Sequence, residues 1–141
     1  MHIISNNQRK IKVDIKSFDE FAGKVIRKTS ETEGKFFTIV FVSDRKMRLL
    51  NNTFRANDAT TDVLSFPFEA EEFETEENNL GDVFISLEQA ERQARENNLD
   101  FETEIKQLIL HGILHLCGYD HENDNGEMNR RELELRELLE I

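Results

Sequence analysis

The chain has 141 residues, of which 38% are apolar and 33% are charged, and its formal net charge is −11. This length and composition predict one soluble globular domain, residues 1–141, with a core large enough to fold without disulfides. No apolar run approaches the roughly 20 residues of a membrane span, and the first residues lack the basic and apolar parts of a signal peptide. The single cysteine excludes an internal disulfide, so the composition favours the cytoplasm.

The charge is distributed unevenly along the chain. Residues 1–55 carry a net charge of +6, whereas residues 56–141 carry −17. Asymmetry of this kind indicates an interaction surface. Solvated helix faces account for most of the acidic residues, so contacts to nucleic-acid phosphates are expected from the first half. Because a broad basic excess is lacking, we expect weak affinity for free nucleic acid and help from a protein partner.

Hydrophobic periodicity predicts short strands alternating with helices. The predicted strands cover residues 2–5, 11–15, 36–42, 62–68 and 81–85. The predicted helices begin at Ser17, at Ser43 or Asp44, at Ser86, near Phe101 and at Asp124. Residues 69–79 contain six glutamates and predict a solvated, mobile loop without chemistry. The order of elements predicts an α/β protein, α+β-like in its details, with a small mixed sheet of about four strands packed by about five helices.

Two of the predicted helices start with a capping box, in which a serine is followed three residues later by Glu or Gln. Ser17 and Glu20 form the first box, and Ser86 and Gln89 form the second. Residues 36–42 form a nearly continuous run of β-branched and aromatic side chains. Such a run is typical of a central strand that is covered on both faces.

Three of the four histidines fall within eleven residues, as His111, His115 and His121. At about 100° per residue, His111 and His115 share one face of a helix that runs from about residue 101 to 117. Gly118 can adopt the left-handed conformation that ends a helix, so His121 can return towards the other two. Three neutral imidazoles leave one tetrahedral position open, which predicts one catalytic Zn²⁺ ion per chain. Nickel, copper or iron would also bind such a site.

The spacing H-x3-H-x2-G-x2-H is also that of the metzincin peptidases. Those enzymes carry a glutamate directly after the first histidine as the general base, whereas this chain has Gly112. A metallopeptidase is therefore a minor alternative. Cys117 is a candidate for the fourth ligand, but it lies about 200° around the helix from His115. We therefore expect its thiol to pack in the core.

The segment from His111 to His121 reads HGILHLCGYDH and resembles the signature H-G-x-L-H-L-x-G-Y-D-H of the bacterial YbeY family. Residues 50–55 with 61–67, and residues 80–86, are similar to other marked stretches of that family. The resemblance extends from about residue 36 to the C-terminus. It implies a metal-dependent endoribonuclease, specific for single strands, that acts in small-subunit ribosomal RNA 3′-end maturation and in ribosome quality control.

The same resemblance implies a set of partners. These are single-stranded RNA and ribosomal RNA, the small ribosomal subunit, and a ribosome-associated GTPase. Neither a membrane nor DNA is expected as a partner. The alternative outside the enzymes is a ribosome-assembly factor whose metal only stabilises the fold. A domain with this many apolar residues does not need a metal ion to fold, which favours catalysis.

Arg55 is the candidate for stabilising the charge that develops on phosphate, because a guanidinium matches phosphate through its planar fork of donors. The family resemblance also implies a functional arginine at this position. His111 and His115 are candidate catalytic residues as well as ligands. Asp120 either orients an imidazole through its second nitrogen or caps a turn. Asp120 and Glu122 are the nearest candidates for a general base, and both water and an RNA 2′-hydroxyl remain possible nucleophiles.

Overall fold

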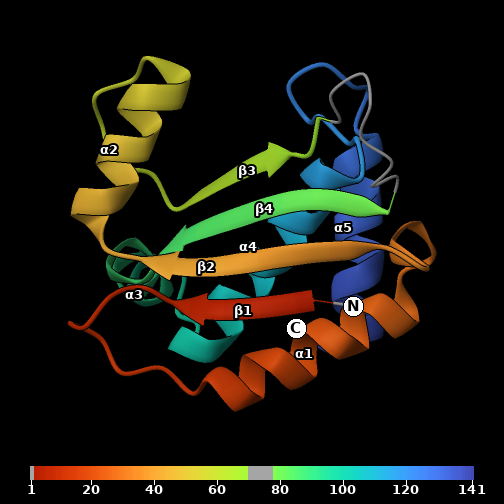
Figure 1. Ribbon diagram of the computed structural model, residues 1–141. Helices are drawn as coiled ribbons and strands as arrows, with labels where there is room; N and C mark the ends of the chain where they lie inside the picture. Colours follow the sequence, from red (N-terminus) through yellow and green to blue (C-terminus); the bar gives the residue numbers. More distant parts are fainter. Residues whose placement is uncertain (1, 70–77) are drawn as a thin grey trace.

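A computed structural model of the chain describes residues 2–69 and 78–141. Its strands are, in chain order, β1 (His2–Asn6), β2 (Phe36–Val42), β3 (Val63–Pro67) and β4 (Asn79–Ser86). They form one sheet in the order β1-β2-β4-β3 (Figure 1). β2 pairs in parallel with β1 and β4, whereas β3 runs antiparallel to β4 at the edge of the sheet. Most of the predicted loop over residues 69–79 lies outside the described residues.

Five α-helices lie within the described residues. They are α1 (Ile15–Lys28), α2 (Asp44–Arg55), α3 (Leu87–Glu96), α4 (Phe101–Leu116) and α5 (Glu127–Leu139). Helices α1, α3, α4 and α5 bury side chains in a main core on one face of the sheet, whereas α2 packs on the opposite face. A four-stranded mixed sheet with five helices confirms the predicted fold class. Among the described helices, none is both long and apolar enough to span a bilayer.

β2 lies in the interior of the sheet, as its sequence predicts, but its two faces differ in burial. Phe37, Ile39 and Phe41 are completely buried in the main core. Thr38 and Val40 point to the other face and are only partly buried. The prediction of a strand covered on both faces is therefore wrong for most of β2, because α2 alone covers part of the second face.

The predicted strand over residues 11–15 is wrong, and so is the predicted cap at Ser17. The Gln8 side chain accepts a hydrogen bond from the Ile11 backbone N–H at 2.8 Å and donates to the Ile11 carbonyl at 2.7 Å. These bonds occupy the backbone groups that strand pairing would use. α1 then begins at Ile15, because the Asp14 side chain caps it by accepting from the Ser17 N–H.

The last helix also begins later than predicted. α5 starts at Glu127 with Gly126 as its N-cap residue. Asp124 still satisfies free donors of the first turn, because its carboxylate accepts from the backbone N–H groups of Gly126 at 2.8 Å and Met128 at 3.0 Å. The predicted cap of α3 is confirmed, because the Ser86 side chain accepts from the Gln89 N–H. α2 begins at Asp44, one of its two predicted starts, and Ser43 caps it.

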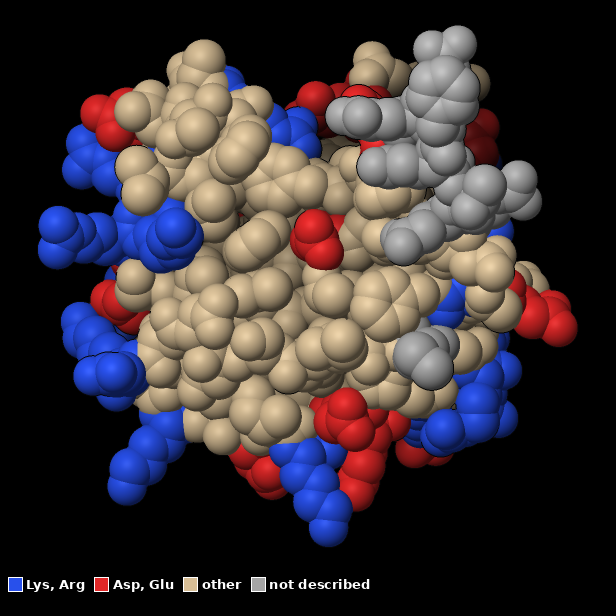
Figure 2. All heavy atoms as spheres, in the orientation of Figure 1, with Lys and Arg blue, Asp and Glu red and all other residues tan. Residues whose placement is uncertain are grey.

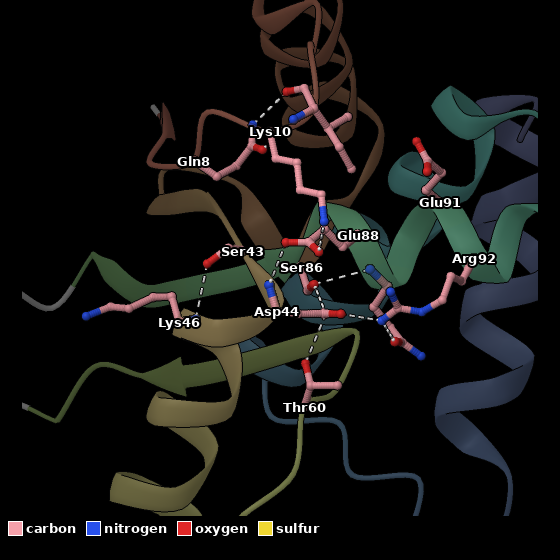
Figure 3. A network of polar contacts seen from close by, with 12 residues as sticks. Gln8, Lys10, Ser43, Asp44, Lys46, Thr60, Ser86, Glu88, Glu91 and Arg92 are labelled. Atoms are coloured by element: carbon pink, nitrogen blue, oxygen red, sulfur yellow. Dashed lines mark hydrogen bonds and ion pairs between the residues drawn. The ribbon is translucent and has the colours of Figure 1, made fainter.

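The first turn of α2 is fixed by a polar network that Figure 3 shows in close view. The Asp44 carboxylate accepts hydrogen bonds from the hydroxyls of Ser86 at 2.5 Å and Thr60 at 3.1 Å, and from Arg92. Glu88 accepts from the Asp44 backbone N–H. Partial burial raises the pKa of Asp44, but the three hydrogen bonds outweigh burial and lower it. The network joins α2 to α3 and to the loop before β3.

Gly112 lies in the C-terminal half of α4 and faces the sheet. A Cβ atom at this position would lie 2.5 Å from Val83 Cγ1 and 3.3 Å from Ser65 Oγ. The Gly112 carbonyl accepts a hydrogen bond from Ser65 Oγ at 3.0 Å. The missing side chain therefore lets the α4 backbone approach β3 and β4 closely, and a glutamate here would collide with the sheet.

We predict that Gly112→Ala lowers the free energy of unfolding by about 1–3 kcal/mol, because the added methyl group overpacks the contact with Val83. Urea unfolding followed by circular dichroism measures this change. Gly23→Ala in α1 is the matched control, since its Cβ would meet the flexible end of Arg27 at 3.3 Å and His2 Cε1 at an ordinary contact distance of 3.8 Å. The control is expected to be neutral or to gain up to about 1 kcal/mol, and equal losses in both variants would contradict the packing argument.

Candidate metal centre

Three imidazoles converge at the C-terminal end of α4. The Nε2 atoms of His111 and His115 lie 3.2 Å apart, as expected for residues one helical turn apart. His121 lies beyond the helix, and its ring centroid is 5.4 Å from that of His111 and 5.2 Å from that of His115. One ring nitrogen from each of the three residues lies within 4.8 Å of the others. The predicted ligands therefore come together.

The turn that brings His121 back towards the other two histidines has the geometry of a Schellman motif. Gly118 has a φ of 101°, which a side chain would disfavour. The Gly118 N–H donates to the His115 carbonyl, and the Tyr119 N–H donates to the Leu114 carbonyl. These bonds end α4 near Leu116, so the glycine stop predicted from the sequence is confirmed.

The outer nitrogen of two imidazoles is held by a hydrogen-bond acceptor. His111 Nδ1 lies 3.2 Å from both oxygens of Glu132, and His115 Nδ1 lies 3.0 Å from the Tyr119 carbonyl oxygen. These acceptors favour the tautomer with hydrogen on Nδ1, which leaves the Nε2 lone pairs directed towards the common point. Burial and the charges of His111 and His121 lower the pKa of His115, which keeps this imidazole neutral at pH 7. The residues therefore fit a transition-metal ion.

Glu132 is the residue in contact with this centre that sequence reasoning missed. Its side chain lies on the buried face of α5, and only 7% of the residue is exposed. Burial raises the pKa of Glu132, but the hydrogen bond to His111 and the charge of Arg136 outweigh it and lower the pKa. The sequence contains a signal for its burial, because Glu132 falls at helical spacing within the buried stripe of Met128, Leu135 and Leu139. Leu133 and Leu138, the other leucines of this part of the helix, are exposed.

Asp120 caps the turn that carries His121. Its carboxylate accepts hydrogen bonds from the Glu122 backbone N–H and from the Asn123 side chain, which is a turn-capping arrangement. Both Asp120 and Glu122 line the cleft beside the histidines.

Cys117 packs against the main core, and burial raises the pKa of its thiol to about 11. A thiol that stays protonated is a poor metal ligand, in agreement with the core position predicted for it.

Arg55 and the three histidines line one open cleft of about 610 Å³. The Arg55 guanidinium is held at the end of α2 by a hydrogen bond from Nη2 to the Ser65 carbonyl at 2.9 Å. Ser65 in turn donates from Oγ to the Gly112 carbonyl, next to His111. Two segments that are far apart in the sequence therefore contribute to one site through β3.

An ion pair supports the loop that carries His121. Glu31, in the 3₁₀ turn η1 (Ser30–Thr32), accepts hydrogen bonds from Arg131 Nη2 at 2.7 Å and from the Tyr119 hydroxyl at 2.9 Å. The Arg131 hydrogen bond is the main cause that lowers the pKa of Glu31 to about 2. The network ties η1 and α5 to the turn between the second and third histidines.

Three converging imidazoles could hold a metal ion, and with an arginine lining the same open cleft the arrangement is compatible with a metal-dependent hydrolase. The family model described as endoribonuclease YbeY matches residues 3–140. The endoribonuclease YbeY of Campylobacter jejuni strain 81-176 is 45% identical over 103 residues, 73% of this chain and 75% of the relative. The endoribonuclease YbeY of Syntrophus aciditrophicus is 35% identical over 141 residues, which cover 96% of this chain and 88% of the relative.

A solved structure is similar to this chain in both fold and sequence. The solution structure of TM1509 from Thermotoga maritima superposes with a TM-score of 0.66 at 30% identity, and covers 99% of this chain and 89% of that one. The chain belongs to the endoribonuclease YbeY family, whose members are named as enzymes that cleave RNA.

We predict that Glu132→Gln weakens zinc binding roughly 10- to 100-fold, because the neutral amide orients His111 less strongly than the carboxylate does. Competition with a chromogenic chelator measures the affinity. Glu137→Gln is the matched control, since Glu137 is exposed on the same helix. Equal affinities for both variants would show that Glu132 does not support the centre.

We predict that Glu31→Gln destabilises the protein at neutral pH, and that its deficit relative to wild type disappears in acid. The pKa of Glu31 in the folded protein, about 2, lies below its ordinary value of 4.5. The ion pair therefore contributes fully above about pH 4.5, and its contribution is lost as the pH falls towards about 2. Urea unfolding of both proteins across this range measures the difference, with Glu33→Gln as an exposed neighbouring control. A deficit that is independent of pH would contradict the assignment.

Proposed function

We propose that this chain is a zinc-dependent endoribonuclease that cleaves single-stranded RNA in the cleft between Arg55 and the three histidines. The observation that carries the proposal is the meeting of His111, His115, His121 and Arg55 around one open cleft, in a member of this family. Three imidazole ligands suit zinc, although other transition metals would also bind. Residues 1–141 would form the single catalytic domain.

When bound, a zinc ion would activate the attacking water or 2′-hydroxyl and polarise a phosphoryl oxygen. The chain's own residues would supply the rest. Arg55, exposed at the cleft and held by the Ser65 carbonyl, would direct its remaining donors at the phosphate and offset the charge of the transition state. Asp120 and Glu122 line the cleft and are the candidates for accepting a proton from the nucleophile. Glu132 would hold the His111 ring in place, which makes it a positioning residue.

We further propose ribosomal RNA as the substrate, at the 3′ end of the small-subunit RNA, with a role in ribosome quality control. The small ribosomal subunit and a ribosome-associated GTPase would be the partners, and the cytoplasm the site of action. The net charge of −11 supports the need for a partner, because it disfavours tight binding of free RNA. The proposal includes neither a membrane nor DNA.

Packing favours catalysis over a purely structural metal. The main core is built from apolar side chains of four helices and the sheet, and the three histidines lie outside it. The fold therefore does not depend on a metal ion in the way that a small zinc domain does. The peptidase alternative loses further support, because any side chain at position 112 would meet Val83 in the sheet.

We predict that purified protein cleaves a labelled single-stranded RNA, that a chelator abolishes cleavage, and that zinc restores it. His111→Ala and His115→Ala should abolish the activity, since each removes a ligand. Arg55→Ala should lower kcat roughly 10²- to 10³-fold, whereas Arg95→Ala, an exposed arginine on α3, should not. Circular dichroism should show that the chelated protein remains folded. Unfolding on chelation, without any cleavage by the metal-loaded protein, would favour the assembly factor with a structural metal.

A further inference from the structure

Phe54 is the most exposed of the large apolar side chains in the described part of the chain, with 63% of the residue accessible. It belongs to the apolar stripe of α2, in which Met47 is completely buried. The stripe continues into the last turn of the helix, where Phe54 extends beyond the small core under α2. An aromatic side chain in this position exposes apolar area to water, and core packing does not account for that exposure.

The exposed ring lies beside the residue that reaches the cleft. Phe54 directly precedes Arg55, which lines the cleft with the three histidines. The Phe54 ring packs edge-on against Phe66, at 5.3 Å between centroids and 65° between planes. The Arg55 guanidinium lies 5.7 Å from the centroid of the same Phe66 ring. Phe66 therefore supports both side chains, and it holds the exposed ring at a fixed place next to the arginine.

The helix that carries this ring has an excess of cations, although the chain as a whole is acidic. Within α2, one acidic residue, Asp44, is outnumbered by four cationic residues, which are Arg45, Lys46, Arg48 and Arg55. Arg48 pairs with Asp58 in the loop after the helix. Lys and Arg side chains gather over α2 at the left of the molecule in Figure 2, whereas the open face of the sheet beside them is mostly uncharged. A basic helix with an exposed aromatic ring beside a phosphate-binding arginine matches the chemistry of a single-stranded nucleic acid.

We propose that Phe54 is a stacking platform for a base of the RNA strand whose phosphate lies at Arg55. The inference rests on the proposed function and adds to it a residue that positions the substrate. A base has a π face on which an aromatic ring stacks, whereas a base within a duplex is already stacked on its neighbours. Phe54 would therefore help to restrict the cleft to single strands without reading their sequence. The cations of α2 would guide the backbone towards the same end of the helix.

The test combines cleavage kinetics with binding that does not require cleavage. Phe54→Leu keeps an apolar contact with Phe66 but removes the aromatic ring, and Phe54→Trp keeps a ring. Leu49→Ala is the matched control, since Leu49 is an exposed apolar residue on the same helix, with 55% of it accessible. We expect Phe54→Leu to raise KM for a single-stranded RNA roughly tenfold with little change in kcat. Phe54→Trp should restore KM to near the wild-type value, and Leu49→Ala should leave it unchanged.

Binding is measured with chelated protein and a single-stranded oligoribonucleotide that contains 2-aminopurine, whose fluorescence falls when the base stacks. Wild-type protein should quench the probe, and Phe54→Leu should not. Thermal unfolding confirms that the variants are folded. A wild-type KM for Phe54→Leu, or quenching that persists without the ring, would overturn the inference even if the chain cleaves RNA as proposed. If the wild-type protein cleaved nothing, the proposed function would fail, and loss of quenching in Phe54→Leu would still support stacking.

Discussion

The close approach of α4 to the sheet at Gly112 sets the geometry on which the site depends. The α4 backbone reaches Ser65 through one hydrogen bond, and the Ser65 carbonyl holds Arg55 through another. The imidazoles and the guanidinium are thus positioned from opposite sides of β3 by short, direct contacts. A bulkier residue at position 112 would move α4 outwards, and with it His111 and His115, away from the arginine.

The site also separates charges that would otherwise neutralise one another. Two carboxylates that support the site already have partners: Glu132 contacts His111 and Arg136, and Glu31 contacts Arg131. The Arg55 guanidinium instead binds a neutral carbonyl, so its positive charge remains available to an anion. An acidic protein can in this way keep the Arg55 cation beside the histidines, although Asp62, Asp120 and Glu122 also line the cleft.

The sequence predicted those features that depend on local spacing, and it failed where distant residues decide. The shared face of His111 and His115 and the stop at Gly118 follow from helix geometry alone, and both are confirmed. The strand predicted over residues 11–15 fails because the Gln8 side chain occupies the backbone of Ile11, which no periodicity reveals. The second face of the central strand is only partly covered, because its coverage depends on where α2 packs.

Glu132 illustrates both the limit of sequence reasoning and a property of the centre. It contacts a histidine 21 residues away, on another helix, so its partner could not be read from spacing. The same carboxylate also accepts from Arg136 at 3.3 Å. Loss of a metal ion would therefore leave no isolated buried charge, because Glu132 keeps both protein partners. In the proposed metal centre, the polypeptide would therefore fold before the ion binds, and the ion would exchange with the surrounding pool while the native structure persists.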